Sequence, residues 1–406
     1  MTTLLTLWRD PALRAVTLTL FLLGAFAGSL APYVSLLGVE VFGLGDGGYA
    51  LVLLASSVLS VILAIYMGIR ADQRANRKGI ATFCAVANLA GIAAVALWPS
   101  SLTYVLAHAI LLPLGSALFG QCFAFARLAA SARPPAERDA ILATARAVFA
   151  LPFILVLPLL SLAVGAGLPL ERIYLIVLVL AVATLALIRR SWPRDGATAW
   201  ADAPSGLTLR AALSEIARPS VSVRVALIGV IACGSALNMA LVGLIFTSVG
   251  GRPDSDVALF VGLFAGLEVP FMLLTPWLLR HFDKTVLIAA GGVIFGLNLI
   301  LLAPLSDTPF VWLLVLPAAC GGAIYLSVPI AYLQDLLADR PGTGSALMAL
   351  QRIASDGTAA LAFVAGTALS GYGLAAVFGA LAAALGGLAL LWLDAAQRQS
   401  KKPFGA

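Results

Sequence analysis

Long apolar runs separated by short polar segments repeat along almost the whole chain. A helix needs roughly 20 apolar residues to cross the hydrocarbon core of a bilayer, and each run has about this length. The runs occupy residues 13–37, 47–69, 79–98, 102–128, 140–164, 171–189, 222–249, 256–279, 285–304, 309–335, 343–369 and 372–393. The pattern therefore predicts an all-α membrane protein with twelve transmembrane helices.

The longest polar interruption divides these helices into two sets of six. It predicts an N-terminal six-helix bundle over residues 1–189, a cytoplasmic linker over 190–220 and a C-terminal six-helix bundle over 221–406. Within the linker, residues 207–217 are a candidate for a helix that lies on the membrane surface.

The two halves share a spacing of charged residues. An Arg-Pro pair at 133–134 precedes Arg146 in the fifth run, and a pair at 340–341 precedes Arg352 in the eleventh run at almost the same distance. An arginine at matching depth in both helices favours two parallel repeats of six helices. This organisation resembles the major facilitator fold.

Composition and charge agree with a membrane protein. Hydrophobic residues make up 61% of the chain and charged residues 11%, against roughly 25% charged residues in soluble domains. The net charge of +6 does not indicate nucleic-acid binding, because the basic residues lie at the ends of the apolar runs. With the N-terminus inside, 21 of the 25 Lys and Arg residues fall in cytoplasmic segments and two in outer loops. We therefore expect both termini in the cytoplasm of a cell with a bacterial-type inner membrane.

No motif points to an enzyme, a cofactor or a metal. The four cysteines, which we expect to be free thiols, lie inside apolar runs at Cys84, Cys122, Cys233 and Cys320. The sequence lacks an ATP-binding phosphate loop, a zinc-protease motif and a serine nucleophile elbow. These absences favour a protein that binds and moves a solute without ATP.

The segment between the second and third runs has a glycine, an acid four residues later and a basic cluster: Gly68, Asp72, Arg74, Arg77 and Lys78. It resembles the signature loop of major facilitator transporters, although Asn76 stands where the family usually has glycine. The resemblance implies a gating role, in which Asp72 contacts the start of the eleventh helix and latches the cytoplasmic side. The alternative is an ordinary basic loop.

Four charged residues lie inside the predicted membrane spans and away from the span ends: Arg146, Glu268, Arg352 and Asp356. A charge at the bilayer centre costs at least ~2.5–3.5 kcal/mol, so these side chains must face the protein interior or an aqueous cavity. Arg352 and Asp356 are four residues apart and can pair on one helix face. Glu268 and Arg146 lie on neighbouring helices of the resembled fold. Either pair is a structural ion bridge or a site of proton coupling, for which Glu268 is the first candidate and Asp356 the second.

Uncharged polar residues are candidates for substrate binding. Gln121, Asn238 and Gln334 lie on helices that line the cavity in the resembled fold, and Tyr33, Tyr325 and Tyr332 offer aromatic faces to a sugar. The alternative for each amide is a hydrogen bond between helices. His108 is a candidate proton relay or a satisfied interior histidine.

Three segments carry a more specific resemblance: Phe123 to Arg127 leading to Arg146, Ala265 to Pro270 followed by Arg280 and Lys284, and Gln334 to Leu337 followed by Arg340, Gly342 and Ser345. Their order and spacing resemble the sugar efflux transporters of the major facilitator superfamily. The resemblance implies export of small sugars or glycosides in exchange for protons. We expect the protein to be a monomer. Gln351, Arg352 and Asp356 depart from that pattern, so two alternatives stay open: an exporter of drugs or other metabolites, and a non-transporting scaffold or sensor.

Overall fold

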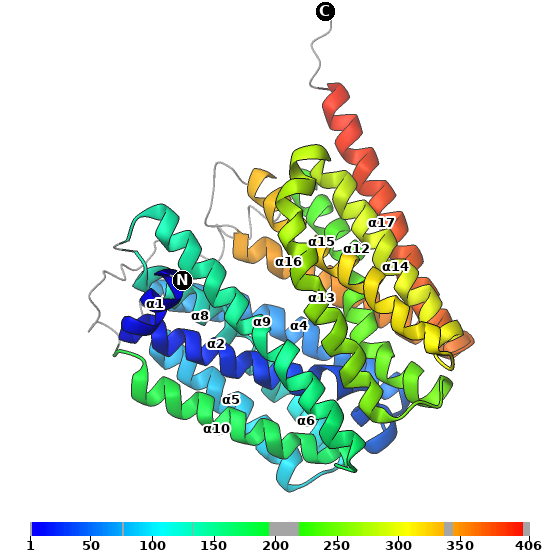
Figure 1. Cartoon of the computed structure of the whole chain (residues 1–406), viewed down its shortest axis with the longest axis horizontal. Helices are drawn as coiled ribbons and strands as arrows, with labels where there is room; N and C mark the ends of the chain where they lie inside the picture. The colour runs from blue at the N-terminus through cyan, green and yellow to red at the C-terminus, as the bar shows by residue number, and fades with distance from the viewer. Residues whose placement is uncertain (1, 75–76, 132, 195–218, 337–343, 401–406) are drawn as a thin grey trace, which may run out of the picture. The chain divides into compact units, whose positions relative to one another are not determined.

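The computed structural model describes residues 2–74, 77–131, 133–194, 219–336 and 344–400. All the regular structure in these ranges is helical, as Figure 1 shows. The chain divides into two compact units, Met1–Ala211 and Ala212–Ala406. This division falls inside the predicted linker, most of which lies outside the described residues.

Unit 1 contains six helical segments of membrane-spanning length, several of them interrupted by short 3₁₀ or π turns (η). Its elements are α1 (Thr2–Arg9), α2 (Pro11–Leu30), η1 (Ala31–Tyr33), α3 (Val34–Leu36), η2 (Leu37–Val41), α4 (Gly45–Arg74), α5 (Arg77–Leu97), α6 (Ser101–Leu106), η3 (Ala107–Leu111), α7 (Leu112–Gly115), α8 (Ala117–Ala129), α9 (Pro135–Gly165), η4 (Leu170–Arg172) and α10 (Ile173–Ser191).

Unit 2 contains the other six predicted helices. Its elements are α12 (Pro219–Leu244), η5 (Ile245–Val249), α13 (Asp254–His281), α14 (Lys284–Leu305), η6 (Pro309–Leu314), α15 (Val315–Leu336), α16 (Gly344–Leu369) and α17 (Tyr372–Ser400). Within the described residues, eleven helical segments of the chain are long and apolar enough to cross a membrane. The twelfth predicted helix forms as α16, which carries Arg352 and Asp356.

Both units use the same pattern of helix contacts. In unit 1 the first long helix, α2, packs against the fifth and sixth, α9 and α10, and the third, α5, packs against α10. In unit 2 the first helix, α12, packs against the fifth and sixth, α16 and α17, and the third, α14, packs against α17. The shared pattern supports the two parallel repeats that the sequence predicts.

The first helix of each unit also ends in the same way. In unit 1 the π turn η2 precedes Gly43, whose φ is +66°, and in unit 2 the π turn η5 precedes Gly251, whose φ is +62°. Glycine suits this left-handed conformation because it has no Cβ. The start of the first helix in unit 1 follows from local chemistry too, because Asp10 accepts hydrogen bonds from the backbone of Ala12 and Leu13 at 3.0 and 3.2 Å.

Glycines bring the first and fifth helices of each unit close together. A Cβ at Gly24 of α2 would overlap the carbonyl oxygen of Phe149 in α9, and a Cβ at Gly229 of α12 would overlap that of Gln351 in α16. Small residues allow such backbone contact, which stabilises helix pairs where lipid removes the hydrophobic driving force.

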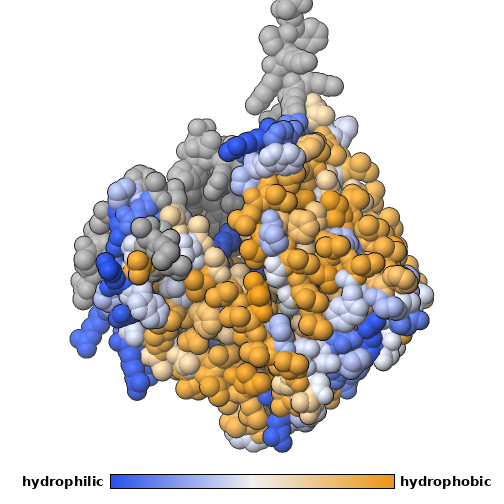
Figure 2. All heavy atoms as spheres, viewed as in Figure 1, coloured by the Kyte–Doolittle hydropathy of each residue, from blue (hydrophilic) through white to orange (hydrophobic). Residues whose placement is uncertain are grey.

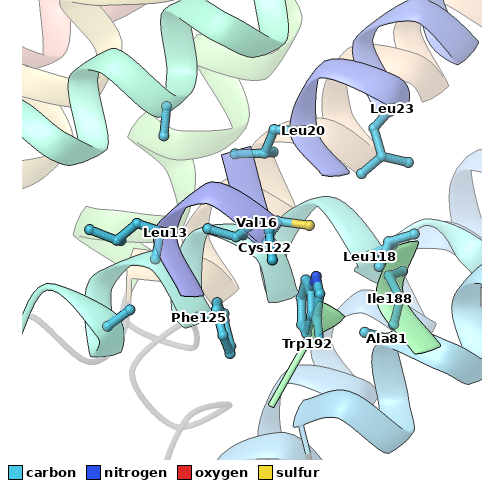
Figure 3. Packing of buried hydrophobic residues seen from close by; sticks show 14 of the residues in the cluster. Leu13, Val16, Leu20, Leu23, Ala81, Leu118, Cys122, Phe125, Ile188 and Trp192 are labelled. Atoms are coloured by element: carbon cyan, nitrogen blue, oxygen red, sulfur yellow. The ribbon is translucent and has the colours of Figure 1, made fainter. Parts of the chain in front are cut away.

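The core of unit 1 near the start of α2 brings together apolar side chains from several helices, among them α2, α5, α8 and α10 (Figure 3). Its centre is the stacked pair Phe125 and Trp192, with ring centroids 4.5 Å apart. The buried indole N–H of Trp192 donates to the Thr19 hydroxyl at 3.1 Å, so the ring has both packing and a polar partner.

Large apolar side chains also cover the outside of the helices. Leu273, Leu361 and Trp392 are among those exposed. Figure 2 shows hydrophobic residues gathered along the helices on the visible face and hydrophilic residues near the helix ends. An apolar exterior of this kind fits lipid rather than water.

Candidate functional site

Glu268 lies near the middle of α13, far from both helix ends. Its half-buried carboxylate packs against the backbone of Gly322 in α15, where an added Cβ would overlap the Oε1 atom. Among the residues that the structure describes, none in unit 2 forms an ion pair or hydrogen bond with this carboxylate. An acid without a cation partner in its own bundle is the feature expected of a proton-binding group in a membrane span.

The second acidic group lies on α16. The Arg352 Nε donates to the Asp356 Oδ2 at 3.2 Å, so the pair expected from their spacing forms. The Arg352 side chain is 70% exposed and that of Asp356 is 14% exposed. The arginine therefore presents its remaining donors to the surroundings while it holds the buried carboxylate.

Tyr325 of α15 lies close to the Arg352–Asp356 pair of α16. Its hydroxyl lies near the side chains of Ser355, Arg352 and Asp356 on α16. Gly322 and Tyr325 are three residues apart on α15, so they lie on neighbouring positions of one helix face. We call Glu268, Gly322, Tyr325, Arg352, Ser355 and Asp356 the polar cluster. It offers two carboxylates, one arginine and two hydroxyl groups from α13, α15 and α16.

Asn238 makes a contact between helices. The Asn298 amide of α14 donates to the Asn238 Oδ1 of α12 at 3.0 Å, and both side chains are fully buried. This geometry favours the helix–helix alternative for Asn238, and its ligand contact stays a prediction.

Tyr332 belongs to a network that the sequence analysis missed. Its hydroxyl donates to Asp394 of α17 at 3.1 Å, the Arg224 Nε of α12 donates to the same carboxylate at 2.8 Å, and Thr285 of α14 donates to it at 2.7 Å. One carboxylate thus joins four helices of unit 2. The signal in the sequence was a single acid, Asp394, directly after the last apolar run.

The candidate residues of unit 1 have different surroundings. Gln121 of α8 is buried, and its Oε1 atom has no hydrogen-bond partner among the described residues. Tyr33 is fully buried, and Arg146 of α9 is exposed. His108 is buried, shares a hydrogen bond of 2.7 Å with the Tyr174 hydroxyl and stacks on Tyr104. These contacts favour a satisfied interior histidine. The predicted pair of Arg146 with Glu268 joins the two units and stays a prediction.

The predicted gating residues lie around the junction of α4 and α5. A Cβ built on Gly68 would meet no atom of the described residues within 4 Å, and the Arg77 side chain is buried. The Lys78 ammonium donates to the carbonyl oxygens of Arg189, at 3.1 Å, and of Trp192, so it caps the end of α10 within unit 1. The side chains of Asp72, Arg74 and Gln334 lie outside the described residues, as do the side chains at the start of the eleventh helix, the predicted latch partner.

No three His, Cys, Asp or Glu side chains gather into a possible metal site in the part of the chain that the structure describes.

The family model named Major Facilitator Superfamily matches residues 16–355. The chain belongs to the major facilitator superfamily. It is therefore a multi-pass membrane transporter of a small molecule, and not an enzyme.

Among curated proteins, the chain is similar to a Deinococcus radiodurans protein named "Putative sugar efflux transporter". The two are 27% identical over 341 residues, which cover 84% of this chain and 86% of that protein.

Solved structures with the same fold include transporters of several named kinds. A crystal structure of the nucleoside transporter NupG has a TM-score of 0.75 at 15% identity and covers 93% of this chain and 98% of its own. A crystal structure of a D-xylose-proton symporter has a TM-score of 0.69 at 16% identity, with 93% and 96% covered. At these identities the likeness shows the fold alone.

Proposed function

We propose that this major facilitator transporter exports small sugars or glycosides through the cytoplasmic membrane in exchange for protons. The observation that carries the proton coupling is Glu268, a mid-membrane carboxylate with no cation partner among the described residues of its own unit. The proposal for the substrate rests on the similarity to the protein named as a sugar efflux transporter.

In this proposal the polar cluster supplies the chemistry. Glu268 binds a proton when the cavity opens to one side and releases it when the cavity opens to the other. Tyr325 and the exposed donors of Arg352 bind sugar hydroxyls, which need several directed hydrogen bonds. Arg146 tunes the proton affinity of Glu268, and Asp72 with the basic loop latches the cytoplasmic side.

The cycle that we propose is alternating access of the two six-helix units. A monomer is sufficient for this cycle, because each unit has its own hydrophobic core. The basic residues favour the cytoplasm for both termini.

Transport by purified protein in proteoliposomes tests this function. An acidic lumen should drive uptake of labelled sugar above the external concentration, because protons that leave the vesicle move sugar inward. A panel of sugars, glycosides, nucleosides and peptides under the same gradient identifies the solute class. Accumulation of nucleosides or peptides without sugars would contradict the proposed substrate class. Sugar uptake at the same rate with and without the pH gradient would contradict proton antiport.

A further inference from the structure

We propose that Gly322 is the positioning residue for the Glu268 carboxylate, an inference that rests on the proposed function. The three atoms nearest to a Cβ built on Gly322 are the Oε1, Cδ and Cγ of Glu268, the last two at 3.1 and 3.5 Å. The carboxyl group therefore occupies the volume that a side chain at position 322 would fill.

The adjacent glycine has a different role. A Cβ at Gly321 would approach the backbone of α14, 2.8 Å from the Phe295 nitrogen and 2.9 Å from the Gly291 oxygen. Gly321 thus allows two helices to approach each other, whereas Gly322 makes room for one acidic side chain. The Gly321-Gly322 pair lets α15 contact α14 on one side and α13 on the other.

Unit 1 shows the same kind of fit with an uncharged group. A Cβ at Gly115 of α7 would overlap the side-chain amide of Asn88 from α5. A glycine in α7 of unit 1 and one in α15 of unit 2 each accommodate a polar side chain from a neighbouring helix. In unit 2 that side chain is an acid.

The position of the carboxylate matters for coupling because proton transfer depends on the distance between the carboxylate and the groups that exchange protons with it. Gly322 places the acid one helical turn from Tyr325, whose hydroxyl lies near Ser355 and Arg352 of α16. A methyl group at position 322 moves the carboxyl group away from α15 and so away from the hydroxyl groups of the polar cluster. Displacements on the order of 1 Å can lower the rate of a positioned chemical step by roughly a hundredfold.

The test compares sugar uptake driven by a pH gradient with sugar exchange at equal pH. Gly322→Ala should lower gradient-driven uptake roughly tenfold or more and shift the pH midpoint of uptake, while exchange continues. Gly266→Ala is the matched control on α13, because a Cβ there meets no atom of the described residues within 4 Å, and it should behave as the wild type.

A second variant separates positioning from folding. Glu268→Asp shortens the acid by one methylene, so the double variant Gly322→Ala with Glu268→Asp should recover gradient-driven uptake relative to either single variant. If Gly322→Ala is indistinguishable from the wild type, or if it loses exchange as well and the shorter acid restores neither activity, the inference is overturned. If Glu268→Gln retains full gradient-driven uptake, the proposed function itself fails, whatever Gly322→Ala does.

Discussion

At the scale of the residue, the buried network around Asp394 is sensitive to a single change. Its carboxylate accepts bonds from Arg224, Thr285 and Tyr332, and the Arg224 side chain is only 7% exposed. Loss of this acid would leave a buried guanidinium without its charged partner, which is costly in a low-dielectric interior.

We predict that Asp394→Ala lowers the free energy of unfolding by about 3–5 kcal/mol. The measurement is thermal unfolding of the purified protein in detergent. Asp307→Ala is the control, since Asp307 is an exposed loop acid, and it should leave the unfolding temperature nearly unchanged. Equal effects of the two substitutions would show that the network contributes little to stability.

The residues also show where sequence reasoning reaches its limit. The i,i+4 spacing of Arg352 and Asp356 is visible in the sequence, and the pair forms. Arg224 and Asp394 are 170 positions apart, and nothing local in the sequence indicates that they meet. The helix–helix role of Asn238 was an open alternative, because choosing it requires knowing that Asn298 faces it.

At the scale of the element, the crossing of α12 and α16 depends on the glycine at its closest point. The Cβ of Gly229→Ala would overlap a main-chain oxygen, which cannot move aside as a side chain can. Overpacking of this kind costs about 1–3 kcal/mol.

We therefore predict that Gly229→Ala lowers the thermal stability and yield of the protein. Gly120→Ala on α8 is the matched control, because its Cβ meets nothing within 4 Å. There the substitution should leave stability unchanged or raise it by up to about 1 kcal/mol, the helix preference of alanine over glycine. A Gly229→Ala protein as stable as the Gly120→Ala protein would contradict the close contact.

The elements themselves follow well from the apolar pattern. All twelve predicted runs lie mainly within helices, and the last helix continues to Ser400, beyond the predicted end at 393. It does so because a helix can extend past its apolar run into polar surroundings. The π turns η2 and η5 could not be predicted, since they depend on packing at the helix ends rather than on hydrophobic periodicity.

At the scale of the whole molecule, the proposed topology places the loop before α10 outside and the end of α13 inside. The four native cysteines lie on membrane helices, and three of them are buried. Single cysteines at exposed loop positions can therefore be labelled above a low background.

We predict that Arg172→Cys reacts with a membrane-impermeant maleimide in intact cells, whereas His281→Cys reacts only after the membrane is opened. Both positions are exposed in the structure, so accessibility of the side chain does not limit either reaction. If only His281→Cys reacts in intact cells, the orientation of the protein is the reverse of the proposed one. If both positions react in intact cells, they lie on the same side of the membrane, and the number of membrane-spanning helices between them is wrong.

The fold of the whole molecule follows from repeated, local signals, whereas the proposed proton coupling depends on one acid, Glu268. Glu268→Gln in proteoliposomes tests that claim most directly, with the exposed acid variant Glu171→Gln as the matched control. We predict that Glu268→Gln abolishes sugar uptake driven by a pH gradient and keeps sugar exchange at equal pH, while Glu171→Gln keeps both. Gradient-driven uptake by Glu268→Gln at the wild-type rate would show that Glu268 does not carry the coupled proton.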